Sequence, residues 1–368
     1  MRVALVTRVF WPNVGGIERH VEWLAKALQR RGHDVRVVTL DRAFEDGRAL
    51  PTQDVLDGIP VRRIPFRGST RYPLAPWVLR ELGDAEVIHV HAVDFLADWL
   101  VATRPVHRRP VVLSTHGGFF HTAFASAAKK LWFQTATRAM VSAVDALICT
   151  SDQDAELFGR ITGKGVVIRN AVDFAAWEGV IPAPEPGRWV NVGRVDVHKG
   201  LGNALRVLAR VAELDPRPFR FDVYGPEVVP GLGDRLRAEA RELGLADRFA
   251  VHGKVSAEVL REAVRTAELG LFPAEYESFG LSVVETMGAG LVPVLQENRA
   301  FRYFVDGETG FLADFRQPDE AARVILRAGD LGDDRVRWSA SARAKALTYG
   351  WDGVIPQIEE VYRRVIAG

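Results

Sequence analysis

Short apolar runs rich in β-branched residues alternate with helix-like patterns along the first half of the chain. The runs cover residues 3–6, 34–40, 87–91, 111–115, 146–150 and 166–170. Between the first two, Val21, Leu24, Ala25 and Leu28 recur at the spacing of one helical face, which predicts a helix over 17–31. Strands that alternate with helices predict a parallel sheet covered by helices on both faces.

The second half repeats the same alternation. Strands are predicted at 189–192, 219–224, 249–252, 269–272 and 292–295, and a proline-rich stretch at 181–187 separates the halves. A chain of 368 residues suits two domains. We therefore expect Rossmann-like domains at 1–172 and 173–350, with a terminal helix at 351–368.

Composition narrows the classes of protein that fit. The apolar content of 48% supports ordinary globular cores, and a formal net charge of +1 gives no general field for nucleic acid. The single cysteine, Cys149, lies in an apolar run and reads as a core thiol. No stretch approaches the roughly 18 to 20 apolar residues of a membrane span, nor has the N-terminus the pattern of a signal peptide. We expect a cytoplasmic protein, with the inner face of the cell membrane as the alternative.

The segment 277–290 is the most informative part of the chain. Glu277 leaves a predicted strand, and Glu285 follows on a predicted helix, with seven residues between them. In open α/β sheets ligands bind at the carboxyl ends of strands. The backbone N–H groups of Gly280 and Leu281 stand at a helix N-terminus, where they suit a phosphate. Two acceptors for hydroxyls beside an anion cradle suit a nucleotide-sugar.

Two further loops offer candidate ligand contacts. Gly15 and Gly16 follow the first strand without a dinucleotide fingerprint, so a tight turn explains them as well as a ligand does. Arg194 and Lys199 follow the strand at 189–192, where a fork and a point charge would hold two phosphates. Lone basic loop residues are more often simply solvated.

Several landmarks occur together in one order: Gly15-Gly16, Thr115-His116-Gly117-Gly118, Gly193-Arg194 to Lys199-Gly200, and Glu277 to Glu285. In that order they resemble the retaining glycosyltransferases of family 4, which have the two-lobed B-type fold. The resemblance covers nearly the whole chain. It implies two doubly wound domains facing across a cleft, with the terminal helix at 351–368 returning to the first domain. It also implies a nucleotide-sugar-dependent hexosyltransferase activity, an acceptor-binding first domain and a donor-binding second domain.

The resemblance also implies roles for individual residues. His116, Arg194, Lys199 and Glu277 would be catalytic, with Arg194 and Lys199 on the diphosphate and Glu277 on the transferred sugar. Glu285 would accept hydrogen bonds from the ribose. The donor-binding set is Gly15, Gly16, Gly193, Arg194, Lys199, Tyr224, Gly225, Lys254, Val255, Glu277, Phe279, Gly280, Leu281 and Glu285.

The run from His116 to Thr122 is similar to that of bacterial exopolysaccharide mannosyltransferases that act on a lipid-linked oligosaccharide. This narrower resemblance implies GDP-mannose as donor and a polyprenyl-diphosphate-linked saccharide as acceptor. Cations mixed with aromatic residues also fit a peripheral membrane contact, although an ordinary half-buried helix fits equally well. Acceptor or membrane candidates are His91, His121, Lys129, Lys130 and Trp132, with Arg62, Arg63, Arg67 and Arg71 adding positive charge.

No metal site and no cofactor are expected. His89 and His91 face the same way on one strand, but no third ligand follows at a convincing spacing. Asp152 and Asp154 follow Ser151, where acids commonly begin a helix. The resembled family requires no metal.

Three alternatives stay open: a soluble UDP-sugar-dependent transferase with a small acceptor, a sugar phosphorylase, and a non-catalytic sugar-binding protein. The chain also departs from the family pattern at residues 295–301, so contacts from that loop are not predicted.

Overall fold

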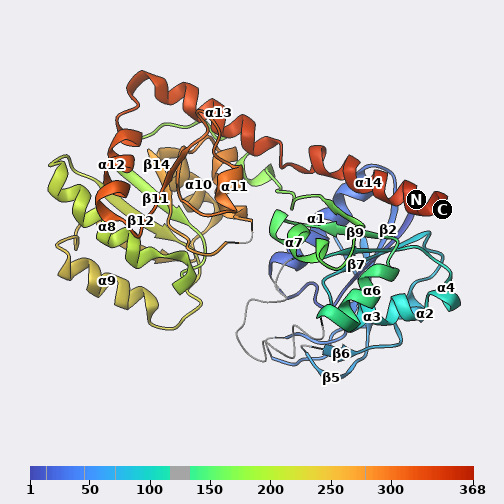
Figure 1. Ribbon diagram of the computed structural model, residues 1–368. Coiled ribbons are helices and arrows are strands. Elements are labelled where there is room, and N and C mark those ends of the chain that lie inside the picture. Colours follow the sequence, from blue (N-terminus) through green and yellow to red (C-terminus); the bar gives the residue numbers. More distant parts are fainter. Residues whose placement is uncertain (14, 45, 71, 117–132, 278) are drawn as a thin grey trace. The chain divides into compact units, whose positions relative to one another are not determined.

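The computed structural model describes residues 1–13, 15–44, 46–70, 72–116, 133–277 and 279–368. The chain divides into two compact units (Figure 1). Unit 1 comprises residues 1–171 and 351–368, and unit 2 comprises residues 172–350. The expected boundary after residue 172 lies one residue further along the chain than the observed one.

Unit 1 is built on a sheet of eight strands in the order β10-β9-β8-β7-β1-β2-β4-β3. All neighbouring pairs are parallel except β3 and β4, which form an antiparallel hairpin. The strands are β1 (Arg2–Thr7), β2 (Asp34–Leu40), β3 (Gln53–Leu56), β4 (Ile59–Ile64), β7 (Val87–His91), β8 (Val111–Ser114), β9 (Ala146–Cys149) and β10 (Gly165–Val167). A separate hairpin pairs β5 (Arg67–Ser69) with β6 (Tyr72–Leu74).

Helices cover both faces of this sheet, as the alternating pattern predicts (Figure 1). One apolar cluster joins the sheet to α1 and α14, and another joins it to α2, α3, α6 and α7. The helices are α1 (Gly16–Arg30), α2 (Val78–Glu81), α3 (Phe95–Ala102), α4 (Arg104–His107), η1 (Phe133–Thr137), α6 (Arg138–Ala143), α7 (Asp152–Gly159) and α14 (Trp351–Ala367). The terminal helix α14 therefore packs in unit 1, beside α1.

Unit 2 contains a fully parallel sheet of six strands in the order β13-β12-β11-β14-β15-β16. The strands are β11 (Arg188–Val192), β12 (Arg220–Tyr224), β13 (Phe249–Gly253), β14 (Leu269–Phe272), β15 (Pro293–Gln296) and β16 (Phe311–Ala313). The sheet order reverses direction between β11 and β14, and ligands of doubly wound sheets bind at such a point.

Apolar residues on both faces of this sheet bind it to helices. One cluster includes α8, α9 and α12, and two others include α10, α11 and α13. The helices are η2 (Ala175–Trp177), η3 (Val197–Lys199), α8 (Leu201–Leu214), α9 (Leu232–Glu242), α10 (Ala257–Thr266), α11 (Leu281–Gly288), η4 (Phe301–Tyr303), α12 (Pro318–Gly329), η5 (Gly332–Asp334) and α13 (Arg335–Leu347).

Two smaller predictions are confirmed. Cys149 is buried at the end of β9, and burial raises the pKa of its thiol to about 12, so it is a core thiol. Asp152 begins α7, where the Ser151 side chain accepts a hydrogen bond from the Asp154 backbone N–H. The acidic pair therefore belongs to a helix start.

Candidate active site

Two loops of unit 2, after β11 and after β14, lie in contact. Gly200, with φ of +65°, ends the short helix η3, and a Cβ atom there would lie 2.2 Å from the carbonyl oxygen of Pro273. The backbone N–H of Glu275 also donates to the carbonyl of His198 over 3.2 Å. Only glycine fits at position 200. The close approach of the two loops brings Lys199 to the end of β14.

Lys199 and Glu277 form an ion pair across these loops. Lys199 Nζ lies 2.5 Å from Glu277 Oε2, and the two side chains are 19% and 17% exposed. An ammonium group has three N–H donors, so one bond to Glu277 leaves others for a ligand anion. The sequence assigned these residues to different parts of a donor, and the structure brings them together.

The N-terminus of helix α11 lies beside the same loops. Its N-cap, Gly280, has φ of +99° and makes no side-chain capping bond. A Cβ atom on Gly193 would lie 3.6 Å from the Ser282 hydroxyl, so the first turn of α11 stands next to the end of β11. The backbone N–H of Leu281 is thus placed where the sequence predicted an anion cradle.

The remaining residues of the 277–290 segment differ in exposure. Phe279 is buried, and its ring packs edge-to-face against Phe304 and Tyr349 at 5.4 Å and 5.6 Å. Any donor contact of Phe279 is therefore left to its backbone. Glu285 lies on α11 and is half-buried.

The ends of β12 and β13 carry the other predicted donor contacts. A Cβ atom on Gly225 would lie 2.0 Å from the Gly193 carbonyl oxygen, so only glycine allows these two loops to meet. The Tyr224 ring is buried and stacks on His252 at 4.6 Å. Lys254 is exposed, whereas Val255 packs against the apolar cluster beneath it.

Arg194 stands apart from the ion pair. Its side chain is exposed, and the described part of the chain gives it no ion-pair partner. The sequence predicted that Arg194 and Lys199 act together on a diphosphate. Both residues follow β11, so a joint role is possible in position. Among the described residues, however, only Lys199 is held in place by an ion pair, the one with Glu277.

In unit 1, Gly15 and Gly16 begin helix α1. A Cβ atom on Gly15 would lie 2.3 Å from the Glu18 carboxylate, whereas one on Gly16 would meet nothing within 4 Å. Gly16 therefore leaves open space at this end of α1, where the N-cap residue Gly15 makes no side-chain capping bond. Burial raises the pKa of Glu18, which stands in this first turn.

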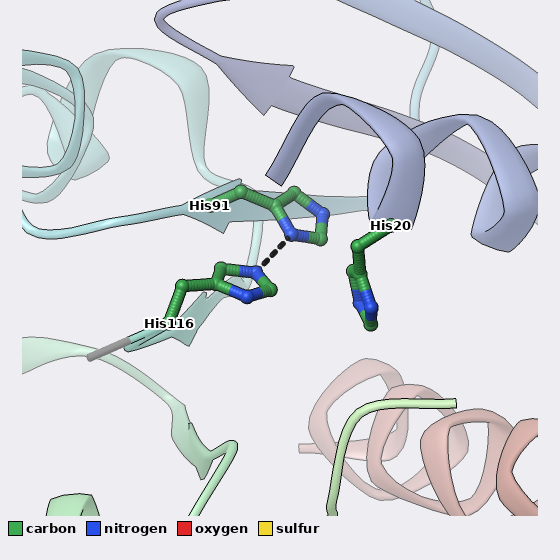
Figure 2. Close-up of side chains that lie close together, drawn as sticks. All are labelled: His20, His91 and His116. Carbon is green, nitrogen blue, oxygen red and sulfur yellow. Dashed lines mark hydrogen bonds between the residues drawn. The ribbon is translucent and has the colours of Figure 1, made fainter. Parts of the chain in front are cut away.

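His116 follows β8 and belongs to a cluster of histidines (Figure 2). Its Nε2 shares a hydrogen bond of 2.9 Å with Nδ1 of His91, which ends β7. His116 has φ of +52°, a left-handed conformation that costs free energy in a non-glycine residue. The ring of His20, from α1, contacts that of His116 edge-on at 4.7 Å between centroids.

A second layer of contacts lies behind His91. The His89 ring is 4.2 Å from that of His91 and bonds to the Tyr362 hydroxyl at 2.6 Å and to the Ser114 hydroxyl at 2.7 Å. Tyr362 comes from the terminal helix α14. Burial lowers the pKa of His89 to about 3 and that of His20 to about 4, and it holds the pKa of His91 and His116 well below the usual value. The cluster is therefore neutral at physiological pH.

The sequence did not reveal the full cluster. Its members come from α1, β7 and the end of β8, so no spacing rule connects them. One signal was available, since His20 lies one turn before Leu24 on the apolar face of α1. The sequence shows no third ligand at a convincing spacing from His89 and His91, and tertiary packing brings His20 and His116 to this group.

The residues predicted to contact the acceptor or the membrane are buried or lie outside the described residues in most cases. His91 is fully buried, which excludes a direct membrane contact in this structure. Arg63 is also buried and pairs with Asp54 at 3.0 Å, so its expected contribution to a basic surface is wrong. His121, Lys129, Lys130, Trp132 and Arg71 lie outside the described residues. No helix among the described residues has the length and apolar character that crossing a bilayer requires.

Comparison with solved structures identifies the fold. Solved structures with the same fold include HepE from Anabaena in complex with UDP, with a TM-score of 0.79 at 17% identity over 99% of this chain and 100% of that one. A sucrose-phosphate synthase from Thermosynechococcus elongatus aligns with a TM-score of 0.74 at 19% identity over 100% and 99%. These likenesses confirm two Rossmann-like domains of the glycosyltransferase B-type fold.

Sequence comparisons give the family. The profile "Glycosyltransferase Family 4" matches residues 14–176, and "Glycosyl transferases group 1" matches residues 180–345. The chain belongs to glycosyltransferase family 4, as its landmarks indicated, and is a sugar-transferring enzyme.

Named relatives extend over the full chain. A GDP-mannose:cellobiosyl-diphosphopolyprenol alpha-mannosyltransferase of Xanthomonas oryzae pv. oryzae is 39% identical over 98% of this chain and 96% of its own length. A protein of the same name from Komagataeibacter xylinus is 35% identical over 100% and 94%. A phosphatidyl-myo-inositol mannosyltransferase of Mycobacterium tuberculosis is 30% identical over 99% and 97%.

Proposed function

We propose that this protein transfers mannose from GDP-mannose to a polyprenyl-diphosphate-linked saccharide during polysaccharide biosynthesis, with retention of the anomeric configuration. The names of the full-length relatives support both the donor and the lipid-linked acceptor. The relative that acts on phosphatidyl-myo-inositol also has a lipid acceptor in its name. These relatives favour a mannosyltransferase over a UDP-sugar-dependent enzyme with a small acceptor.

The observation that carries the proposal is the contact between Lys199 and Glu277. In a nucleotide-sugar, the bond that breaks joins the sugar to a phosphate. A cation for the phosphate and an acceptor for sugar hydroxyls must therefore lie close together, one on each side of that bond. Lys199 and Glu277 meet this requirement in unit 2.

We assign the donor contacts accordingly. Lys199 and Arg194 neutralise the charge that develops on the departing diphosphate, an effect worth several kcal/mol in comparable sites. Gly280 and Leu281 direct backbone N–H groups of the α11 N-terminus at the donor. Glu285 accepts hydrogen bonds from the ribose. Gly193, Gly225, Tyr224, Lys254 and Val255 line the ends of β11, β12 and β13, where we place the rest of the nucleotide.

His116, with Gly15 and Gly16, contributes from unit 1. Because burial keeps His116 neutral, it acts on the donor sugar through a hydrogen bond and does not supply a positive charge. Its hydrogen bond to His91 fixes the orientation of the ring. We therefore assign His91 an indirect role in holding His116.

The proposal also covers the need for a metal or cofactor and the location of the enzyme in the cell. Transfer needs no metal and no cofactor, because cationic side chains serve the diphosphate. The acceptor lipid lies in a membrane, so we place the enzyme as a peripheral protein at the inner face of the cell membrane. Activity that is unchanged by a chelator, and protein that floats with liposomes containing the lipid acceptor, are the expected results.

A donor panel tests the function. Purified protein is incubated with GDP-mannose, GDP-glucose, UDP-glucose or UDP-galactose, each with and without cellobiosyl-diphosphopolyprenol, and nucleotide release is measured. We expect release from GDP-mannose that depends on the lipid, together with a mannosylated lipid product. Equal or faster transfer from a UDP-sugar would contradict the donor. Formation of a sugar phosphate with inorganic phosphate would indicate a phosphorylase, and binding without turnover a sugar-binding protein.

A further inference from the structure

Three histidines of unit 1 converge from three separate elements. One ring nitrogen each of His20, His91 and His116 lies within 4.8 Å of the others. Figure 2 shows His91 and His116 facing each other, with the His20 ring standing beside them. Within the part of the chain that the structure describes, no other group of three histidine, cysteine, aspartate or glutamate side chains comes this close.

The cluster is incomplete as a hydrogen-bonded group. Nδ1 of His20 and Nε2 of His91 are buried and have no hydrogen-bond partner among the described residues. Buried polar atoms in proteins are almost always paired. Both residues are buried, with exposed fractions of 7% for His20 and 0% for His91. An added ligand would therefore meet an unpaired nitrogen on His20, and His91 has a second nitrogen that can take up a proton.

The surrounding contacts hold the rings in place. The His89 ring packs against that of His91 at a tilt of 33° and is itself bonded at both nitrogens, to Tyr362 and Ser114. Trp351 packs against His20, with ring centroids 5.3 Å apart. A ligand would thus meet rings that are already oriented, and orienting contacts behind the ligands are typical of metal sites.

The chemistry of the three side chains selects the ligand. Imidazole nitrogens suit zinc and the neighbouring divalent transition ions, whereas magnesium and calcium prefer oxygen. Three histidines are also a common protein ligand set for zinc, with a fourth position left to another ligand. A metal needs the neutral form of each ring, and the apolar surroundings of the cluster already favour that form.

We propose that His20, His91 and His116 bind one divalent transition-metal ion of the zinc class, and that the bound ion inhibits transfer by occupying His116. The inhibition rests on the proposed function, since it requires the contact of His116 with the donor. The binding itself does not.

The protons of the cluster limit how binding occurs. His91 Nδ1 and His116 Nε2 share one proton in their hydrogen bond. For both nitrogens to ligate, that proton must move to the other nitrogen of the ring that carries it, which in His91 is the unpaired Nε2. Binding therefore breaks this hydrogen bond and changes one tautomer, without net release of a proton.

Metal binding is measured first, on the full-length protein after treatment with a chelator. Equilibrium dialysis with Zn²⁺ gives the stoichiometry, and visible absorption of added Co²⁺ reports the ligand geometry. We expect one ion per chain. His20→Ala should weaken binding at least about 100-fold, because a lost ligand costs more than the 10–100-fold of a lost supporting group. His107→Ala is the control, since His107 lies on α4 and bonds to the Leu100 carbonyl.

Three results would overturn the proposal: no bound ion at micromolar Zn²⁺, equal binding by His20→Ala and His107→Ala, or a Co²⁺ spectrum typical of six oxygen ligands. In the first case, a buried water explains the unpaired nitrogens. His91→Asn provides a second variant in case His20→Ala does not fold, which circular dichroism would show.

Transfer is measured separately. Zn²⁺ should lower the rate of transfer by the wild-type enzyme about tenfold or more at saturation, and a chelator should restore it. The remaining activity of His20→Ala should be insensitive to Zn²⁺ at the same concentration. If the metal binds but transfer is unaffected, the inhibitory role is wrong. If no transfer occurs with any donor, the proposed function fails while the binding result still stands.

Discussion

Lys199 Nζ contacts Glu277 Oε2 at 2.5 Å, although 78 positions separate the two residues along the chain. The contact depends on the close approach of the loops after β11 and β14, which Gly200 permits. Both side chains are mostly buried, so neither is replaced without affecting its partner. The pair therefore acts as one unit, in which replacing the lysine removes the cation that this carboxylate contacts at 2.5 Å.

This coupling predicts a non-additive double-mutant cycle. Lys199→Met and Glu277→Gln should each lower kcat/KM by about 100- to 1,000-fold, in the range found for the loss of one transition-state contact. The double variant should be less impaired than the product of the two effects, with a coupling free energy of about 1–3 kcal/mol. Steady-state kinetics with the preferred donor gives these values.

The control for this cycle is Lys345→Met, which removes a cation paired with Asp306 elsewhere in unit 2. Its kcat/KM should stay within about twofold of the wild type, as expected for an exposed pair. Fully additive effects of Lys199→Met and Glu277→Gln would show that the two residues act independently.

Gly280 should not tolerate a side chain. Its φ of +99° disfavours other residues, and a Cβ atom would lie 2.7 Å from the Phe301 ring. Gly280→Ala should cost about 2–4 kcal/mol in the free energy of unfolding, from backbone strain together with overpacking. It should also weaken nucleotide binding, because the α11 N-terminus moves. Urea denaturation and calorimetric titration with GDP measure the two effects.

Gly307→Ala is the control that separates backbone strain from overpacking. Gly307 also has positive φ, at +56°, but a Cβ atom there would meet nothing within 4 Å. This variant should lose only about 1 kcal/mol and bind GDP normally. Equal losses in the two variants would assign the whole cost at Gly280 to its backbone conformation.

Glu359 should make the stability of the enzyme depend on acid pH. Its side chain is 2% exposed and receives hydrogen bonds from Arg31, His33 and Arg363. The bond from Arg31 is the main cause that lowers the pKa of Glu359 to about 2. Because the folded-state pKa lies below the unfolded value, the stabilisation is complete above about pH 5 and is lost as the pH falls from there towards 2.

Glu359→Gln should therefore destabilise the protein by about 1–3 kcal/mol at pH 7, and its difference from the wild type should shrink as the pH falls below 4.5. Urea unfolding at pH 7, 4 and 3 measures this trend. Glu360→Gln is a matched control, because the neighbouring carboxylate is 71% exposed. A difference between Glu359→Gln and wild type that does not vary with pH would refute the assignment.

The buried hydroxyl group of Tyr362 should contribute to stability through one hydrogen bond. Its hydroxyl bonds to His89 Nδ1 at 2.6 Å, and both rings are fully buried. Tyr362→Phe leaves that nitrogen unpaired and should cost about 1–3 kcal/mol in the free energy of unfolding. Tyr72→Phe removes an exposed hydroxyl that bonds to Asp98 and should cost less than about 1 kcal/mol. Equal costs would mean that the buried bond has no special weight.

Most of the fold follows from periodicity. The predicted strands at 34–40 and 87–91 coincide with β2 and β7, and the predicted helix at 17–31 is displaced by one residue from α1. These elements are long or strongly apolar, so local pattern decides them. The hairpins β3–β4 and β5–β6 escaped prediction, since their runs are short and apolar residues such as Val55 and Leu74 lie at exposed positions, which breaks the expected alternation.

The candidate site likewise has features that the sequence predicts and contacts that only the folded structure shows. Glu277, Glu285 and Lys199 could be predicted because strand ends and glycine turns mark them in the sequence. The contact between Lys199 and Glu277, and the packing of His20 against His116, depend on tertiary approach. Tertiary structure also explains the wrong prediction for Arg63. Its place in a basic run indicated an exposed charge, but its side chain is buried against Asp54 and the Trp11 carbonyl.

A crystal structure with intact GDP-mannose bound would show whether Lys199 and Glu277 hold the donor. We expect the diphosphate within hydrogen-bond distance of Lys199 Nζ and the Arg194 guanidinium, the mannose hydroxyls on Glu277, and the ribose on Glu285. A donor bound at other residues, or Glu277 and Lys199 turned away from a donor that occupies the loops after β11 and β14, would contradict it.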